Sequence, residues 1–273
     1  MTAIRPPAAA GRFYPAQPER LQAAVRAYVD AATPVAGAAT ALIVPHAGYR
    51  YSGPVAGAAY ACMKGARGTV RRVVLLGTAH WTGVAGLAAS GADRFTTPLG
   101  VVPLDRPALK RVIGLPQVTI DDDAHELDHA LEVQLPFLQV TLGDFALAPF
   151  LVGRSTPDEV AALLDVLWGG VETLVVVSSD LSHGHASEDA RRLDRATAGA
   201  IEALRPDGVG PEQACGHRAI AGLLTAARRH GLRAVTADLR NSGDTAGPSD
   251  AVVGYGAFVF VEPAGPRAGR APR

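Results

Sequence analysis

The stretch RRVVLLGTAH, residues 71–80, contains an unbroken apolar run that ends in small and polar residues. A short run of this kind, rich in Val and Leu, is typical of a strand buried on both faces of a sheet. Three other stretches share the pattern: ATALIVPHAG (39–48), FALAPFLVG (145–153) and ETLVVVSSDLSH (172–183). Because helical or loop-rich segments separate these strands, the sequence predicts an α/β protein with a mixed, largely parallel sheet between helical layers.

Amphipathic and small-residue segments predict the helices that cover this sheet. One of them has a clear start signal, because Ser155 or Thr156 can cap a helix that has Pro157 in its first turn. No internal repeat or linker divides the chain, so we predict one domain over 1–262 and a disordered tail over 263–273. The expected helices span 18–31, 54–65, 122–134, 157–169, 187–204 and 211–231, with a hairpin at 95–104 and two final strands at 233–243 and 252–262.

Composition narrows the class of partner. The 26 basic and 26 acidic residues cancel, which argues against a nucleic-acid or membrane surface and favours a small-molecule or peptide ligand. The chain shows neither an N-terminal signal peptide nor a membrane-length apolar run. Its two cysteines cannot build a disulfide framework, so we expect a cytoplasmic protein.

Polar side chains follow three of the predicted strands. His46 ends the first, His80 ends the second, and Asp180 with His183 follows the strand at 172–178. Ligands of open α/β sheets bind beyond the carboxyl ends of the strands. A single buried histidine is usually structural, but three in equivalent positions favour a shared site.

The residue types at these strand ends suit a metal. Neutral imidazoles bind iron, copper and zinc, and two histidines with one anionic ligand leave positions open for a substrate. Asp180 is one candidate for the anion, or it orients a histidine from outside the ligand set. Cys215 is the other, because it lies near the start of a predicted helix, where the helix dipole favours a thiolate. Cys62, within an Ala-rich helix, is interpreted as a buried apolar residue.

The segment HELDH (125–129) matches the H-E-x-x-H pattern of zinc peptidases, in which two histidines one helical turn apart bind zinc. His125 and His129 would be the ligands and Glu126 the base. The longer metzincin form of the pattern is absent, since Glu132 stands where it requires glycine. A zinc peptidase is therefore the third hypothesis.

A second interpretation of the same predicted helix joins it to the strand-end site. His129 and Glu132 are three residues apart and share a helical face, so they can support the metal ligands or contact substrate. The alternative is a solvated acidic helix.

The sequence lacks a phosphate-binding loop, a G-x-G-x-x-G fingerprint and a G-x-S-x-G nucleophile motif. Three further histidines are expected at the surface or at helix ends: His185, His217 and His230.

Taken together, ordered sequence blocks over about residues 4–262 resemble the Memo family, whose prokaryotic members are called AmmeMemoRadiSam system protein B. In fold that family is similar to the class III extradiol (LigB-like) non-haem iron dioxygenases. The blocks that carry the resemblance are RPPAAAGRFYP (5–15), VPHAGYRYSGPVAGAAY (44–60), LGTAHW (76–81), DHALEVQLPFLQ (128–139), VVVSSDLSHG (175–184) and ACGHRAI (214–220).

The resemblance implies a set of roles. His46 and His80 match the family's two histidine ligands, and Cys215 falls where the dioxygenases carry a carboxylate ligand. His183 matches the dioxygenase acid/base, and Asp180, which lies beside it, is expected to orient it. The expected metal is iron(II), with copper or zinc as alternatives. The protein would then be a metal-dependent, dioxygenase-like oxidoreductase.

Two departures from the family pattern leave alternatives open. Trp81 replaces a neighbouring histidine and is expected to narrow the pocket. A thiolate is softer than a carboxylate, which favours copper(I) or a redox role over ring cleavage. A non-catalytic protein that binds a ligand or peptide is therefore the second hypothesis. The family's name also implies partnership with an AMMECR-type protein and a radical SAM enzyme.

Overall fold

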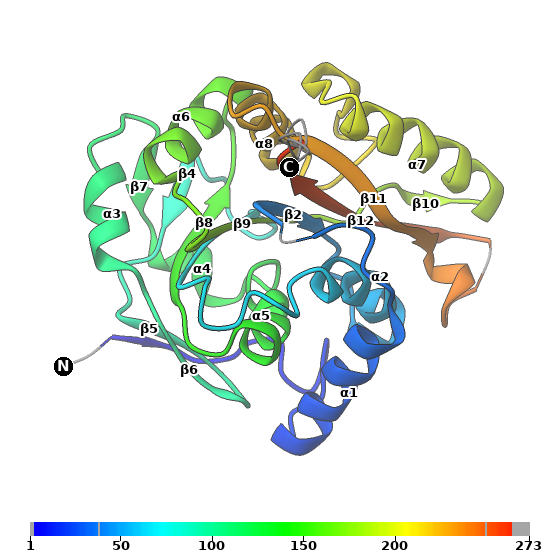
Figure 1. Ribbon diagram of the computed structural model, residues 1–273, viewed down its shortest axis with the longest axis horizontal. Helices are drawn as coiled ribbons and strands as arrows, with labels where there is room; N and C mark the ends of the chain where they lie inside the picture. Colours follow the sequence, from blue (N-terminus) through cyan, green and yellow to red (C-terminus); the bar gives the residue numbers. More distant parts are fainter. Residues whose placement is uncertain (1–2, 38, 249, 264–273) are drawn as a thin grey trace, which may run out of the picture.

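The computed structural model describes residues 3–37, 39–248 and 250–263, so the tail predicted at 263–273 lies almost wholly outside the described residues. Over the described ranges the chain forms one large sheet and one small one (Figure 1). The large sheet contains, in order, β10 (His183–His185), β12 (Val252–Val261), β2 (Ala41–Val44), β9 (Thr173–Ser178), β3 (Arg72–Thr78), β8 (Ala146–Val152), β4 (Leu87–Ala89) and β7 (Val118–Ile120), and β11 (Arg233–Asn241) also pairs with β12.

The centre of the large sheet is parallel. Strands β2, β9, β3 and β8 run in one direction, whereas β12 pairs antiparallel with β2 and β4 pairs antiparallel with β8. The predicted fold class, a mixed and largely parallel sheet between helical layers, is thereby confirmed. The small sheet joins β1 (Ile4–Arg5) to the predicted hairpin of β5 (Arg94–Thr97) and β6 (Gly100–Pro103).

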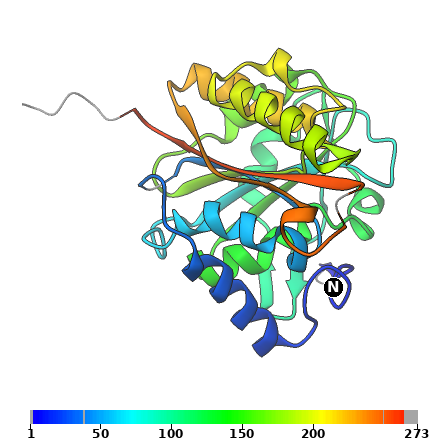
Figure 2. The same ribbon diagram turned by 90° about the vertical axis from the view of Figure 1, so that its right-hand side faces the viewer.

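Helices cover both faces of the large sheet, as the two views show (Figures 1 and 2). One face is covered by α2 (Tyr49–Ala61) and α5 (Leu135–Leu142), and α1 (Pro18–Ala31) packs against these two helices. The other face packs against α3 (Arg106–Val112), α6 (Pro157–Leu167), α7 (Ser187–Glu202) and α8 (His217–Arg229). Short elements complete the description: α4 (Asp122–Glu126) and 3-10 turns at Glu132–Gln134, Pro206–Gly208 and Ser242–Asp244.

The alternation of side chains along each central strand creates the two cores. In β3, Val73 and Leu75 join the core beneath α1 and α2, and Val74 and Leu76 join the core beneath α6 and α8. All four are fully buried. Each such side chain stabilises the fold by about 1.5–3 kcal/mol through removal of apolar surface from water.

Several helix boundaries differ from the sequence prediction. The helix expected at 122–134 is wrong, because α4 ends at Glu126 and a turn follows. The side chain of Asp128 accepts a hydrogen bond from the backbone N–H of Ala130 (2.8 Å), and this local bond competes with helical pairing. Helix α3 was not expected; Asp105 caps it by accepting from Ala108 N at 2.9 Å.

Other boundaries shift by a few residues. Helix α2 begins at Tyr49 and contains Pro54, and α8 begins only at His217. The predicted cap of α6 is confirmed at Thr156, which forms a capping box with Glu159. Among the described residues, no helix is both long and apolar enough to cross a membrane.

Candidate metal centre

The register of the central strands aligns the predicted site residues. Ser178, the last residue of β9, lies opposite Val44 of β2 and Gly77 of β3. Since these strands are parallel, the chain segments that leave their carboxyl ends emerge at one edge of the sheet. His46 and His80 follow the ends of β2 and β3, so they lie near each other at this edge.

A loop before α8 carries Cys215 to the same edge. Gly216 permits this approach, because a Cβ atom there would lie only 2.7 Å from Cβ of Ser179. The backbone N–H of Gly216 donates to Ser179 Oγ at 2.9 Å, which fixes the loop against the end of β9. Cys215 Sγ consequently lies 3.3 Å from Nε2 of His46.

His46, His80 and Cys215 form a candidate metal-binding group, since one ligand atom of each lies within 4.8 Å of the other two. The rings of His46 and His80 are almost perpendicular, at 79°, with centroids 5.1 Å apart. Around a tetrahedral ion, bonds of about 2.3 Å to sulfur and 2.0 Å to nitrogen separate the two ligand atoms by about 3.5 Å. The observed separation of 3.3 Å between Sγ and Nε2 fits a shared ion.

Hydrogen bonds set the tautomer of His46. Ser178 Oγ donates its one proton to the carbonyl of Ala130 (2.6 Å) and accepts from Nε2 of Gln134 (2.8 Å). It can only accept from the His46 ring, whose Nδ1 lies 3.1 Å away. Nδ1 therefore carries the proton, and Nε2 keeps a free lone pair on the side of Cys215.

The carboxylate of Asp128 holds His80 in a similar way, through hydrogen bonds to its backbone and ring. Asp128 Oδ2 accepts from the His80 backbone N–H at 2.7 Å, and Oδ1 lies 3.3 Å from Nδ1 of the ring. A carboxylate behind a histidine ligand orients the ring and increases its basicity. Burial lowers the pKa of His80, but hydrogen bonds to Asp128 and Cys215 outweigh it and raise that pKa to about 9. A metal that binds His80 must therefore displace a proton.

His80, Asp128 and His129 form a second close group, but its geometry suits an ion poorly. The rings of His80 and His129 are stacked, with centroids 4.6 Å apart and planes at 24°. Because an imidazole lone pair lies in the ring plane, two stacked rings cannot both point at one ion. Phe13 covers His129 at 4.2 Å. Burial and the nearby His46 and His80 lower the pKa of His129 to about 3, so its ring is neutral.

His183 and Asp180 also reach this edge of the sheet, with separate contacts. Nδ1 of His183 donates to the carbonyl of Leu181 at 2.9 Å, which leaves Nε2 available to the cavity. Asp180 was expected to orient His183, and in this respect the prediction is wrong. Its Oδ1 instead accepts from the backbone N–H groups of His46 (2.7 Å) and Ala47 (3.3 Å). Asp180 thus fixes the loop that carries a ligand.

A cavity of about 480 Å³ is lined by two members of the candidate metal-binding group, His46 and His80, and not by Cys215. Its lining includes the aromatic side chains of Phe13, Tyr51 and Tyr255 and the imidazole of His129. A volume of this size is typical of a small-molecule site.

Two residues predicted for this pocket lie elsewhere. Glu132 is fully buried, and its carboxylate accepts from Arg5 Nη1 (2.6 Å), Tyr14 OH (2.5 Å) and the N–H groups of Ala8 and Ala9 (2.8 Å each). It therefore anchors the N-terminal segment, and the prediction of a substrate contact is wrong. Trp81 is 68% exposed and does not line the cavity, so it does not narrow the pocket as predicted.

The zinc-peptidase arrangement is not formed. His125 lies on α4, but His129 lies in the turn after that helix, so the two rings do not share a helical face. His125 is 2% exposed, and its Nε2 lies 3.0 Å from the carbonyl of Ala88. Burial, assisted by the charge of Arg5, lowers the pKa of His125 to about 4. This histidine is a neutral, structural side chain.

The low pKa of His125 predicts an acid-dependent loss of stability. The unfolded state takes up a proton near pH 6.5 and the folded state only near pH 4, where the pKa of buried His125 lies, so stability falls as pH decreases through this window. We expect a loss of about 3 kcal/mol. Urea unfolding at a series of pH values should show this component in the wild type and not in a His125→Gln variant. Parallel pH profiles for the two proteins would refute the assignment.

The functional residues that sequence reasoning missed are mainly the partners of the ligands. The sequence motifs assign no role to Asp128, which is one of the unspecified positions of H-E-x-x-H, and none to Gln134 or Ser178. One signal was available: all three lie within sequence blocks that also contain site histidines or follow a buried strand. Nothing in the sequence indicated that Phe13 stacks on His129.

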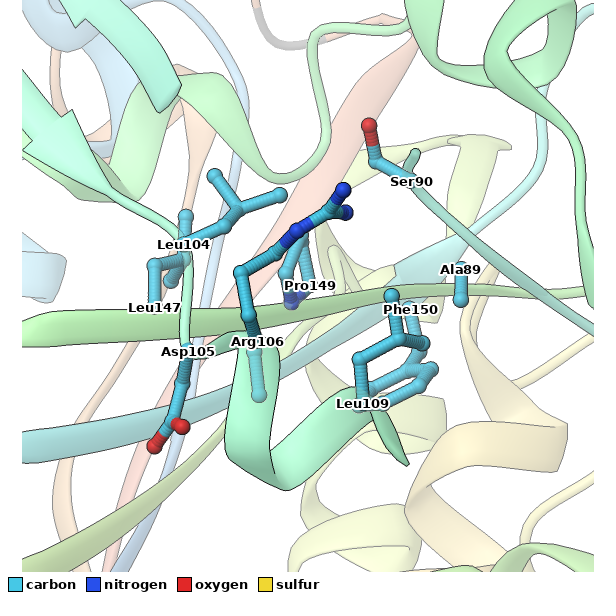
Figure 3. Close-up of a pocket in the computed structure, with 10 residues that line it drawn as sticks. Ala89, Ser90, Leu104, Asp105, Arg106, Leu109, Leu147, Pro149 and Phe150 are labelled. Atoms are coloured by element: carbon cyan, nitrogen blue, oxygen red, sulfur yellow. The ribbon is translucent and has the colours of Figure 1, made fainter. Parts of the chain in front are cut away.

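A further cavity lies between β4, β8 and α3 (Figure 3) and is not a second site. Its volume is about 10 Å³, room for one water molecule at most. Most side chains around it are aliphatic or aromatic, and Ser90 and Arg106 also line it. The carboxylate of Asp105 points away from it and binds Arg72 (2.6 Å).

The fold and this site define a class: an α/β protein with a mixed sheet, whose strand ends carry a candidate His/His/Cys metal centre. The model of the Memo-like protein family matches residues 5–259. The chain belongs to the Memo family, as its sequence blocks indicated.

Relatives support this assignment along nearly the whole chain. A MEMO1 family protein of Aeropyrum pernix is 39% identical over 278 residues, covering 92% of this chain and 98% of its own. A MEMO1 family protein of Methanosarcina barkeri is 33% identical over 269 residues, covering 94% and 99%. A crystal structure of an uncharacterized Escherichia coli K12 protein has a TM-score of 0.50 at 13% identity, covering 80% of this chain and 98% of that chain. It supports the fold alone.

Proposed function

We propose that the protein is a metal-dependent redox protein in which His46, His80 and Cys215 hold iron(II) or copper. The observation that supports this most is the convergence of two imidazole nitrogens and one sulfur within 4.8 Å of one another. Both rings have their other nitrogen bound by a fixed partner, so the free nitrogens are prepared for a ligand role. A bound ion would supply electron transfer and an open position for substrate or dioxygen.

The remaining residues act on the substrate. Phe13, Tyr51 and Tyr255 form flat apolar walls that bind a small, aromatic or planar molecule and exclude water. His183 faces the same space with Nε2 and transfers a proton to or from the bound molecule. His129 is neutral, so it offers the ligand a hydrogen bond without adding charge.

Cys215 favours a second candidate function. A thiolate is oxidisable and binds copper(I) and zinc well, and these preferences differ from those of a carboxylate ligand that supports ring cleavage by iron. In this second candidate function, the cavity recognises a small molecule or peptide without turnover. Both candidates suit a reducing compartment such as the cytoplasm, because Cys62 and Cys215 are free thiols. Partnership with AMMECR-type and radical SAM proteins stays a prediction.

Oxygen uptake distinguishes the two functions. The full chain is loaded with iron(II) without air and then exposed to dioxygen with a panel of catechols. We expect uptake by the wild type, and a loss of about 100-fold or more in a His183→Gln variant that retains its iron, since a positioned acid/base contributes about 10²–10⁴-fold. Catechol binding without uptake would favour the binding protein. Equal turnover in the variant would exclude His183 from the reaction.

A further inference from the structure

The HELDH segment borders two separate cavities. Its last histidine, His129, lines the cavity at the candidate metal centre, and its first, His125, lines another of about 310 Å³, which we call the α4 cavity. Among the described residues, none lines both. The α4 cavity is formed by β1, by the segment after β4 and by α4. It is large enough for a small molecule, and the proposed function makes no use of it.

The α4 cavity carries a net negative charge. Three carboxylates of α4 line it, those of Asp122, Asp123 and Glu126. Within the described ranges Arg5 is its only cationic side chain, and that guanidinium is 6% exposed and bound to Glu132 at 2.6 Å. The charge of Arg5 is therefore neutralised within the protein, and the three carboxylates attract a cation from solution.

His125 has a structural bond on one side of its ring and an unused lone pair on the other. The side chain is 2% exposed. Its Nε2 lies 3.0 Å from the carbonyl of Ala88, which can only accept, so Nε2 carries the proton and Nδ1 the lone pair. In the described part of the chain Nδ1 has no hydrogen-bond partner, and only Thr82 Oγ1 and Ser182 Oγ are both unpartnered and sealed from solvent. Nδ1 is therefore open to the cavity that His125 lines.

Asp122 is fixed in place with one oxygen to spare. Its Oδ1 accepts from the hydroxyl of Ser90 (2.7 Å) and from the N–H of Gly91 (2.8 Å). A Cβ atom at position 91 would lie only 2.7 Å from Oδ2, so glycine leaves room for this oxygen. No donor among the described residues binds Oδ2. Asp122 and His125 are three positions apart on α4, so their two available acceptors lie on one face of the helix.

The positions of the acceptors favour a ligand whose donors are spread apart. A metal ion or a compact ammonium group binds acceptors that converge on one point. Where the chain is described, three ligand atoms of His, Cys, Asp or Glu converge within 4.8 Å only in the two groups beside the other cavity. A guanidinium carries five N–H donors in one plane, which reach separate acceptors, and its charge suits the carboxylates. Ile4, Pro6 and Ala92 add apolar surface for a short alkyl chain.

We propose that the α4 cavity binds a small molecule with a guanidinium group, which donates to Nδ1 of His125 and to Oδ2 of Asp122. The carboxylates of Asp123 and Glu126 offset its positive charge, and the apolar lining covers its alkyl chain. This site does not depend on a metal, on Cys215 or on the proposed function.

The test uses n-butylguanidinium, titrated into the full chain without added metal. The control n-butylammonium has the same charge and chain with a compact head, and n-butylurea has a planar head of similar shape without charge. We expect the guanidinium probe to bind about tenfold more tightly than either, because only this probe combines spread donors with a charge. The nitrogen NMR resonance of His125 Nδ1 should shift on saturation, since this atom gains a hydrogen bond.

Two variants locate the binding. Asp123→Asn combined with Glu126→Gln removes two exposed charges and should weaken the guanidinium probe by about three- to tenfold at low salt. Asp122→Asn retains Oδ1 and places a donor where Oδ2 accepted, so the loss should be about tenfold or more. Asp207→Asn, which removes an exposed carboxylate outside the cavity, is the matched control and should bind as the wild type does.

Equal binding of the three probes would overturn the inference, as would wild-type affinity in the double variant together with an unmoved His125 resonance. The double variant alters only exposed side chains, so the test holds even if Asp122→Asn does not fold. A blocked tripeptide with a central arginine distinguishes the source of the group. If it bound about tenfold more tightly than n-butylguanidinium, the occupant would be a protein side chain and not a small molecule.

Discussion

Replacement of Cys215 by serine is expected to weaken metal binding by about 100-fold or more, because it removes the one anionic donor of the candidate group. His46→Ala should have an effect of similar size, since the free Nε2 faces the sulfur at 3.3 Å. Elemental analysis after anaerobic reconstitution gives the metal content per chain, and competition with a chelator gives the affinity. The wild type should bind about one iron or copper ion that both variants lose.

A graded variant and a surface control sharpen this prediction. Asp128→Asn keeps the ligands and weakens the support of His80, so the affinity should fall by about 10–100-fold. His230→Ala, in an exposed contact with Asp165, should have no effect. Wild-type metal content in both Cys215→Ser and His46→Ala would refute the site, and a loss in His230→Ala would show that the assay reports unfolding.

Replacement of Glu132 by glutamine is expected to destabilise the fold by about 3–5 kcal/mol, since it leaves Arg5 as an unpaired buried cation. The two side chains are 0% and 6% exposed, and their atoms lie 2.6 Å apart. The same change weakens the bonds to Tyr14 and to the N–H groups of Ala8 and Ala9. Urea unfolding monitored by circular dichroism measures the difference.

Glu126→Gln is the matched control, because Glu126 is exposed on α4 and should change stability by less than about 0.5 kcal/mol. If Glu132→Gln were as stable as the wild type, the buried pair would not hold the N-terminal segment. A second readout follows from the stacking of Phe13 on His129: loss of the anchor should also weaken ligand binding in the cavity.

The sheet and the main helices could be predicted because their signals are local. The apolar runs of β2, β3, β8 and β9 are too short and too continuous for surface helices, and each stops at polar residues. That pattern predicts that His46, His80 and Asp180 lie at one edge of the sheet. The cap of α6 was readable from Thr156 and Pro157 alone.

The remaining features depend on contacts that no local pattern reveals. Acidic residues and helical spacing suggested a helix through 122–134, but one side-chain bond from Asp128 to Ala130 N interrupts it. Glu132 shares a predicted face with His129, yet its partners are Arg5 and Tyr14, more than a hundred positions earlier. Such long-range pairing is visible only in three dimensions.

The donors of the candidate centre are dispersed along the chain, with Cys215 lying 169 positions after His46. During translation the thiol of Cys215 leaves the ribosome long after both histidines. A chain that is still being synthesised therefore lacks one of the three donors until that point. The three donors can come together only after synthesis of α8 has begun and its preceding loop has reached the sheet.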